Sequence, residues 1–494
     1  MTFDEFKRYA ENFTVIPISR TLLADMHTPV SAYLSLRHGT KFSFLFESAE
    51  QNERIGRNSF IGIDPLMMVR ALDHGCEVWS PAGRTMEEGD IFSVLAKRSA
   101  GFRQAPVEGL AGFSGGFVGY LGYQAVRHLE KIPCAPLPPD RESESMFALF
   151  GDVLRFDHLR QSMTMVHNVL VDPSISLLRQ FESANQTLDA LELRLRRPGM
   201  SAQHFSADEK IEESMTREEY CKAVRRAKEY IVEGDIFQVV LARRLAMHYE
   251  GDLFSVYRAL RIINPSPYLF YLDFGETTLV GSSPEVLLRV QGETASVMPI
   301  AGTRKRGATE TEDLALEQEL LNDEKELSEH VMLVDLGRND IGRIAEYGSV
   351  EVPVLKRIER YSHVMHIVSE VKGRLRTDRT SLDALKACFP AGTVSGAPKV
   401  RAMEIISELE SVSRGAYAGA VGYLGFNGSL DTCIAIRTLV AHGGVLSVEV
   451  GAGIVADSVP EREYEETASK VRAPLEAVTL ATRGLNVIPQ SLLV

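Results

Sequence analysis

The chain has 494 residues, of which 45% are hydrophobic and 24% charged, proportions that exclude a wholly disordered or collagen-like protein. A net charge of −13, from 54 basic and 67 acidic residues, argues against a general nucleic-acid binder. Five cysteines without a C-x-x-C pair, no signal-peptide core and no run of about 18 apolar residues favour a reducing, cytoplasmic setting without a membrane span.

The first half of the chain alternates short apolar runs with turn signals, which predicts strands at 41–48, 75–80 and 162–171. A helix is expected at 174–195. The glycine-rich stretch FSGGFVGYLGY (113–123) could be a phosphate loop, but it lacks the G-x-x-x-x-G-K-[ST] pattern. Close backbone packing is the favoured interpretation, because glycine permits close approach.

A polar stretch poor in aliphatic residues, 194–215, indicates a linker with a boundary near 197–214. We therefore expect an N-terminal domain at 1–205 and a second, larger domain at 206–494.

The second half opens with a capping box from Thr216 to Glu219, followed by a helix to about Glu233 and a strand at 236–249. Further strands are predicted at 268–274, 277–281, 285–290, 294–300, 417–424, 431–440 and 445–450. Further helices are predicted at 310–336, 381–389, 398–410 and 459–481. Runs of strands with helices between them predict an α+β fold with large antiparallel sheets in a sandwich-like arrangement, helices outside and two interlocked subdomains.

Two acidic pairs stand at helical spacing, Glu326 with Glu329 and Glu463 with Glu466. Such a pair is most often a solvated helix face. The first pair leads into an apolar helix and the second follows the glycines at 451 and 453, however. Carboxylates converging from two helices would suit Mg²⁺, which prefers oxygen ligands.

A possible anion pocket lies at FPAGTVSGAPK (389–399), a small-residue loop entering a helix with Pro398 in its first turn. An ordinary turn is an equal alternative. Arg437, among aliphatic residues, needs a buried partner, either a substrate carboxylate or a structural acid. Tyr417 and Lys470 could complete the pocket.

Proton carriers are less certain from the residues alone. His363 and His366 lie in an apolar segment, where histidine is usually a satisfied core residue. Glu285 is by itself an ordinary loop acid. No nucleophile elbow or dinucleotide fingerprint occurs, so the residues alone indicate a Mg²⁺-dependent enzyme acting on a small carboxylated molecule.

Several long motifs together resemble the chorismate-utilising enzymes, and within them the large subunits of anthranilate synthases. These motifs are EGDIFQVVLARR (233–244), NPSPYLFYL (264–272), GSSPE (281–285), PIAGTRKRG (299–307), DEKELSEHVMLVDLGRND (323–340), FPAGTVSGAPK (389–399) and GAGIVADSVPEREYEE (451–466). With their spacing they cover about 215–480.

The resemblance implies an amination of chorismate to anthranilate and pyruvate, with Mg²⁺. Relatives that add water typically carry a lysine where this chain has Gln238, and aminodeoxychorismate synthases often carry one at Ala301. With neither amine present, a diffusible nucleophile is implied, and ammonia fits. Aminodeoxychorismate synthase and a non-catalytic tryptophan-binding relative remain alternatives.

The resemblance also implies residue roles at matching positions. Glu329 and Glu466 correspond to direct Mg²⁺ ligands, supported by Glu326 and Glu463. Glu285 corresponds to the general acid, with His366, Thr393 and Glu326 assisting. The expected chorismate contacts are Gly302, Thr303, Tyr417, Arg437, Gly451, Ala452, Gly453 and Lys470.

A second resemblance, at LFESAEQNERIGRNSFIG (45–62), is to the segment with which anthranilate synthases bind feedback tryptophan. It implies an allosteric site made of Glu47, Ser48, Pro267, Tyr268 and Leu269. No cysteine lies in an amidotransferase elbow, and the chain ends soon after its last predicted helix. We therefore expect a separate glutaminase subunit, in a hetero-oligomer such as a heterotetramer.

Overall fold

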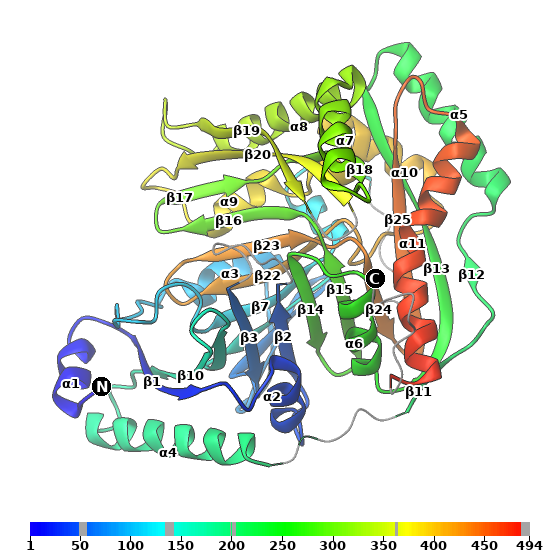
Figure 1. Cartoon of the computed structure of the whole chain (residues 1–494). Helices are drawn as coiled ribbons and strands as arrows, with labels where there is room; N and C mark the ends of the chain where they lie inside the picture. Colours follow the sequence, from blue (N-terminus) through cyan, green and yellow to red (C-terminus); the bar gives the residue numbers. More distant parts are fainter. Residues whose placement is uncertain (49–56, 134–142, 198, 200–203, 361–363, 486–494) are drawn as a thin grey trace.

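The computed structural model describes residues 1–48, 57–133, 143–197, 199, 204–360 and 364–485. Within these ranges the chain forms two antiparallel sheets of 13 and 12 strands with helices outside them (Figure 1). The predicted α+β class with large antiparallel sheets is confirmed. None of the helices in the described ranges has the length and apolar character needed to cross a membrane.

The 13-stranded sheet has strands from both halves of the chain. In spatial order they are β1 (Val15–Leu23), β10 (Ser162–Leu170), β9 (Asp152–Asp157), β3 (Asn58–Ile63), β2 (Ser43–Glu47), β14 (Tyr268–Asp273), β15 (Thr277–Ser283), β24 (Thr438–His442), β25 (Val445–Ile454), β13 (Gln238–Gly251) and β11 (Phe205–Ala207), with β12 (Glu212–Glu213) and β21 (Gly396–Ala397) also on β13.

The 12-stranded sheet likewise contains strands from both halves of the chain. Its order is β18 (Ile300–Lys305), β20 (Val364–Arg374), β17 (Thr294–Val297), β16 (Val286–Gln291), β23 (Leu430–Ile434), β22 (Ala420–Gly425), β7 (Gly116–Leu121), β8 (Ser145–Phe150), β4 (Met67–Leu72), β5 (Gly75–Ser80) and β6 (Gly83–Glu87), with β19 (Glu351–Arg360) on β20.

Each sheet passes from the first half of the chain to the second at one strand pair. In the larger sheet that pair is β2 with β14, and in the smaller sheet it is β7 with β22. The stretch predicted as a linker also contains β11 and β12, which pair with β13. The two halves are therefore interlocked. The division into domains at 205/206 stays a prediction.

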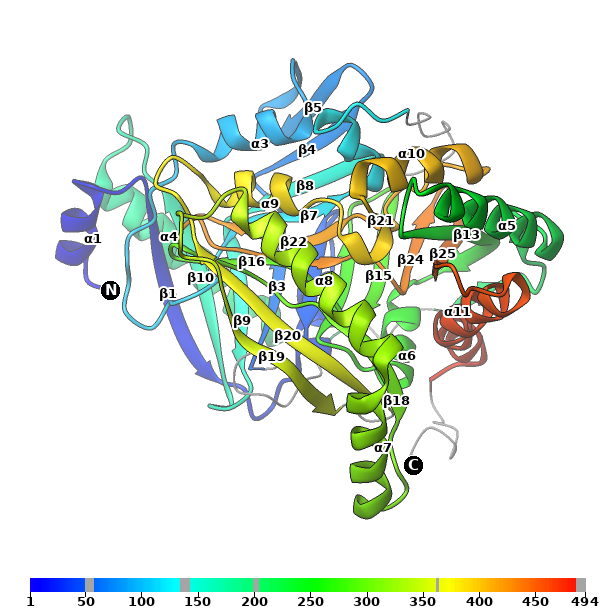
Figure 2. The ribbon, with the colours of Figure 1, turned by 90° about the horizontal axis from the view of Figure 1, so that it is seen from above.

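Helices cover the outer faces of the sheets. In the described ranges they are α1 (Phe3–Ala10), α2 (Pro29–Leu36), α3 (Ile91–Ser99), α4 (Leu177–Leu195), α5 (Arg217–Glu233), α6 (Phe254–Ile263), α7 (Glu310–Asn322), α8 (Glu324–Gly342), α9 (Ser381–Cys388), α10 (Lys399–Leu409) and α11 (Pro460–Arg483), with short 3₁₀ turns η1 (Tyr123–His128) and η2 (Gly392–Val394). Helix α8 crosses β18 and β20, and α11 lies along β25 (Figure 2).

Local sequence signals explain where several helices begin and end. The capping box predicted at Thr216 is present, and Gly234 ends α5 in the left-handed region at φ 86°. The prediction of a single helix at 310–336 is wrong. This segment forms two helices, because the Asp323 side chain accepts hydrogen bonds from the first backbone amides of α8 and starts a new helix there.

The glycine-rich stretch 113–123 is not a phosphate loop but contains β7, in the middle of the smaller sheet. A Cβ on Gly119 would lie 2.0 Å from the carbonyl oxygen of Met146 on the adjacent strand. The predicted close backbone packing is confirmed.

Two predicted strands are each split in two. The strand at 294–300 is β17 followed by β18, and the strand at 431–440 is β23 followed by β24. The second split has a large effect, because β23 belongs to the 12-stranded sheet and β24 to the 13-stranded sheet. Arg437, predicted within a strand, instead lies between the two with φ 49°.

Candidate active site

Two neighbouring segments carry the chain between the sheets, and each contributes a charged side chain. The first crossing (284–285) joins β15 to β16, and the second crossing (435–437) joins β23 to β24. Both flanking strand pairs are hydrogen-bonded to each other, so the crossings run side by side. The amide of Ile434 donates to the carbonyl of Glu285 at 3.0 Å. Glu285 and Arg437 therefore lie on adjacent crossings.

The Glu285 carboxyl is placed to hold a proton near neutral pH. Burial raises its pKa to about 7, against the opposing effects of the Thr393 hydroxyl, Lys470 and Arg437. It lines a pocket of about 420 Å³, counting its open mouth, between α8 and the loop before α10. A carboxyl with this pKa can act as a general acid.

The Arg437 guanidinium makes no ion pair with any described residue. Its Nη1 donates a hydrogen bond to Oδ1 of Asn264 at 3.3 Å. Burial lowers its pKa, and the nearby Glu285 carboxyl opposes this. Of the two alternatives for its partner, a structural acid is not observed among the described residues, which favours a ligand carboxylate.

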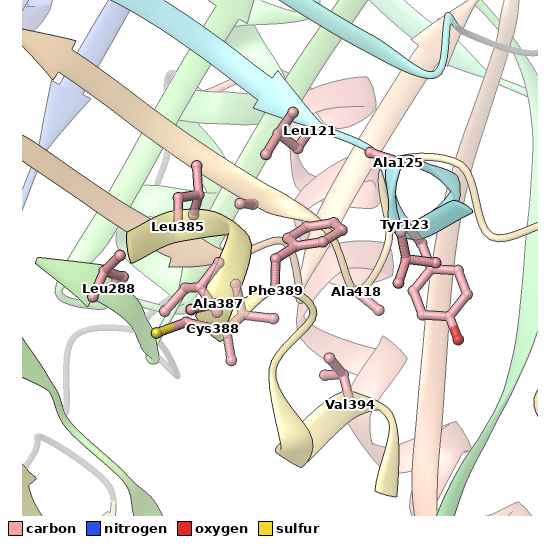
Figure 3. Close-up of a cluster of buried hydrophobic side chains, with 14 of the residues drawn as sticks. Leu121, Tyr123, Ala125, Leu288, Leu385, Ala387, Cys388, Phe389, Val394 and Ala418 are labelled. Carbon is pink, nitrogen blue, oxygen red and sulfur yellow. The ribbon is translucent and has the colours of Figure 1, made fainter. Parts of the chain in front are cut away.

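The loop predicted as an anion site runs from Phe389 to Pro398 and includes η2. Phe389 and Val394 are packed in a buried hydrophobic cluster that fixes the loop (Figure 3). Between them, Oγ1 of Thr393 is buried next to the Glu285 carboxyl, whose pKa it lowers. Pro398 is not in the first turn of α10 but at its N-cap position. The loop therefore places a side-chain hydroxyl beside Glu285.

A β-bulge at Gly302 brings three predicted site residues together. Nδ1 of His366 lies 3.0 Å from both the Gly302 carbonyl and the Thr303 hydroxyl. Because a carbonyl only accepts, the neutral ring carries its proton on Nδ1. Burial lowers the pKa of His366, and Arg437 lowers it further. His363 lies outside the described residues.

Strand β25 carries the two predicted contact glycines, Gly451 and Gly453. A Cβ on Gly451 would lie 2.6 Å from the Tyr417 hydroxyl, and one on Gly453 would lie 2.7 Å from Nε2 of Gln238. Ala452 between them is buried. Lys470 of α11 donates to the Gly451 carbonyl at 2.9 Å. These small residues let polar groups approach the backbone closely.

The four glutamates of the predicted metal site lie on α8 and α11, two on each helix, and Glu466 of α11 is close enough to Glu329 of α8 to raise its pKa. Burial raises the pKa of Glu329, and the Glu326 and Glu466 carboxylates add to the rise. The pKa of Glu463 is also raised, first by burial and then by Glu466. This mutual repulsion fits a hard cation between the helices.

These carboxylates are nevertheless not gathered at coordination distance. In the described part of the chain, no group of three or more His, Cys, Asp or Glu could hold a metal ion. Glu466 is paired with Lys470 at 2.8 Å, and Glu326 lies 3.5 Å from Arg304. Their donor chemistry fits Mg²⁺, whereas their present arrangement would have to tighten.

Sequence reasoning missed three polar residues that support this site. Asn264 contacts Arg437, and Arg414 is buried behind Tyr417. Lys399 donates to Asp340 at 2.9 Å, which links the end of the 389–398 loop to α8. The sequence signal that could have found them is a charged residue among small and apolar neighbours. That signal was applied to Arg437 alone.

A second pocket lies at the junction of β2 and β14 and holds about 530 Å³ of empty space, counting its open mouth. It is lined by all five residues predicted for the allosteric site, namely Glu47, Ser48, Pro267, Tyr268 and Leu269. Its other lining residues come from β2, β3, β14, β16, β22 and β23 and include Phe60, Arg289, Tyr423 and Asp431. Residues 49–56 of the matching motif lie outside the described residues.

The second pocket has aromatic walls and charged ends. The buried Glu47 carboxylate accepts from the Tyr257 hydroxyl at 2.5 Å and pairs with Arg261 at 3.0 Å. The Tyr268 hydroxyl donates to Asp431 at 2.7 Å. Such a lining suits a small aromatic molecule with a charged group.

Comparison with known proteins gives consistent matches along the chain. Residues 41–476 match the family of chorismate binding enzymes. Anthranilate synthase component 1 of Acetivibrio thermocellus is 46% identical over 486 residues, 97% of this chain and 98% of its own length. The protein of the same name from Thermus thermophilus is 46% identical over 475 residues, 95% of this chain and 99% of its own.

Solved structures agree with the fold. The crystal structure of anthranilate synthase component I from Streptococcus pneumoniae TIGR4 superposes with a TM-score of 0.76 at 35% identity, covering 92% of this chain and 98% of that one. The menaquinone-specific isochorismate synthase of Escherichia coli, at 19% identity and a TM-score of 0.69 over 96% and 98%, shares the fold.

Proposed function

The chain belongs to the family of chorismate-binding enzymes, and we propose that it is an anthranilate synthase component I, converting chorismate and ammonia to anthranilate, pyruvate and water. The structural observation that carries the proposal is that two groups lie on adjacent crossings: the Glu285 carboxyl, whose pKa is about 7, and the Arg437 guanidinium, which forms no ion pair with any described residue. The family's substrate has two carboxylates, which need a cation such as Arg437, and a hydroxyl leaving group, which needs an acid such as Glu285.

Chorismate would be held by its carboxylates in a protein that carries 13 net negative charges. Arg437 and Lys470 are the cationic side chains on its expected contacts, and Tyr417 and Thr303 offer hydroxyls. Gly302, Gly451, Ala452 and Gly453 would let the ligand meet backbone groups. The charge needed to bind a dianion is thus local to the site.

Glu285 would give its proton to the departing C4 hydroxyl, because hydroxide is a poor leaving group. Ammonia forms the new bond at C2 as the ring double bond shifts and the C4–O bond breaks, with release of water. Loss of the C2 proton and of the enolpyruvyl group, which leaves as pyruvate, gives the aromatic ring. Thr393 would orient Glu285, and His366 would support Thr303.

Magnesium ion would be held by Glu329 and Glu466, with Glu326 and Glu463 supporting, and when bound would draw electron density into the C1 carboxylate. This assignment is supported by the raised pKa values of Glu329 and Glu463, which reflect burial and closely placed like charges. Each of these four glutamates would then place a carboxylate oxygen towards the ion or towards a water molecule bound to it.

Tryptophan would bind the pocket between β2 and β14 as a feedback inhibitor, with Glu47 facing its ammonium group and the aromatic walls facing its indole. Ammonia would come from a separate glutaminase subunit, in a hetero-oligomer such as a heterotetramer. The four described cysteines are all free and buried, which supports a reducing, cytoplasmic setting.

The proposal is tested with purified protein, chorismate, Mg²⁺ and an ammonium salt at alkaline pH, recording anthranilate fluorescence. Formation of anthranilate and an equal amount of pyruvate is expected. Release of 4-amino-4-deoxychorismate, or no turnover, would overturn it.

A further inference from the structure

Arg414 is a buried arginine whose guanidinium contacts several separate parts of the chain. Its side chain is 2% exposed. Nη1 donates to the carbonyl of Val394 and Nη2 to the carbonyl of Val240, each at 2.7 Å. The guanidinium carbon lies 5.5 Å from the centre of the Tyr417 ring. One planar group therefore ties a loop, a strand and an aromatic ring together.

Each of these partners is next to a residue predicted for the active site. Val394 follows Thr393, whose buried hydroxyl faces Glu285. Val240 stands opposite Gly453 in the β13–β25 ladder. Tyr417 holds its hydroxyl against Gly451. Arg414 itself does not line the pocket, so its influence passes through its partners.

The charge of Arg414 is balanced by Glu410, which also holds β13. Nε and Nη2 of Arg414 donate to the two Glu410 oxygens at 2.8 and 2.5 Å. Oε1 of Glu410 also accepts from the amide of Ala242 at 2.8 Å. A buried ion pair adds little net stability compared with apolar residues of the same volume, because both charges lose their hydration. Its fixed geometry is the stronger reason for its presence.

We propose that Arg414 is a positioning residue for the reaction proposed above, holding the Thr393 loop, β13 and Tyr417 in one fixed relation to each other. This inference depends on the proposed function. The loop has a second anchor, because Lys399 donates to both Asp340 and the carbonyl of Cys388. Weakening Arg414 should therefore let Thr393 shift without releasing the whole loop.

The test is Arg414→Lys, which keeps the charge but cannot reach four acceptors at once. We expect kcat to fall by about 10²-fold, the effect of misplacing a reacting group by roughly 1 Å, with the KM for chorismate changed less than threefold. The pH profile supplies a second readout. Thr393, Lys470 and Arg437 all face Glu285 and lower its pKa, so withdrawal of Thr393 should move the alkaline limb of the rate to higher pH.

The matched control is Arg401→Lys on α10. Arg401 also pairs with two acids, Asp235 and Glu404, and lies over a tyrosine ring, but its partners are outside the site. We expect wild-type kinetics from it. Glu410→Asp shortens the side chain that pairs with Arg414 and should cause the same loss of kcat. It replaces Arg414→Lys in the test if that variant does not fold.

A purely structural role would lower Tm while leaving kcat and the pH profile of the folded enzyme unchanged, and that result would overturn the proposal. Failure of the proposed function is seen separately, in the wild type. If the wild type makes another product from chorismate, the same split between kcat and KM is measured on that product. If it makes none, hydrogen exchange of the backbone amides in the 389–398 loop decides: equal exchange in wild type and Arg414→Lys would overturn the positioning role, and faster exchange in the variant would support it.

Discussion

Nη1 of Arg437 lies 3.3 Å from Oδ1 of Asn264, and this contact lies between the candidate active site and the segment that lines the pocket at β2 and β14. Asn264 begins a short segment whose later residues, Pro267 to Leu269, line the pocket between β2 and β14. Ser282, fully buried, bonds to both Asn264 and Ser266 and donates its amide to the Arg437 carbonyl at 3.2 Å. A ligand that moves this segment would move Arg437, which is a physical route for coupling the two sites.

Asn264→Asp should weaken chorismate binding. The new carboxylate would lie against Arg437 and neutralise the charge meant for the substrate. We expect the KM for chorismate to rise by about tenfold, equivalent to 1.4 kcal/mol, with a smaller change in kcat. Steady-state kinetics with saturating ammonia measure this. An unchanged KM would show that Arg437 does not bind a substrate carboxylate.

Glu285→Gln should abolish proton donation without disturbing the fold, with kcat lower by about 10²–10⁴-fold. In the wild type, kcat/KM corrected for free ammonia should fall as pH rises through about 7, because Glu285 then loses its proton. The variant should lack this limb. A wild-type kcat/KM, corrected for free ammonia, that is equal at pH 8 and pH 6 would contradict the assignment.

The same substitution should affect stability in a pH-dependent way. The folded-state pKa of Glu285, about 7, lies above its ordinary value of 4.5, so the folded protein binds the proton more tightly. Stability is therefore lost as pH rises from about 4.5 through 7. Glu285→Gln removes this cost and should raise Tm by roughly 2 °C at pH 8, with little change at pH 4. Calorimetry at the two pH values checks the sign.

Glu329→Gln should remove the response to Mg²⁺. Without metal it relieves the repulsion from Glu326 and Glu466, so Tm should rise slightly, whereas the increase in Tm on adding Mg²⁺ and the metal-dependent activity should disappear. Glu324→Gln, an exposed glutamate on the same helix, is the control. A wild-type Mg²⁺ affinity in Glu329→Gln, measured by titration calorimetry, would exclude it as a ligand.

Ser48→Phe should leave activity intact and raise the tryptophan concentration needed for inhibition by more than about tenfold, since the ring would fill the pocket between β2 and β14. Ser174→Phe, on an exposed loop before α4, should remain inhibited as in wild type. Unchanged inhibition of Ser48→Phe would place tryptophan elsewhere.

Local patterns predicted most elements well, because capping groups and alternating apolar residues act over a few neighbours. Thr216 and Gly234 ended up where their chemistry requires. The strand containing Arg437 was predicted as one piece, since nothing in TCIAIRTLV shows that its two ends enter different sheets. The partner of Arg437 was equally invisible, because Asn264 is 173 residues away.

The strand pairs β2–β14 and β7–β22 have a consequence for how such an enzyme could be divided. A fragment starting near residue 206 would expose the backbone edges of β14 and β22, each with unpaired hydrogen-bonding groups. Those edges would recruit other chains, so the fragment should aggregate rather than remain as an uninhibited catalyst. Deregulation of this architecture should therefore arise by point substitution rather than by truncation.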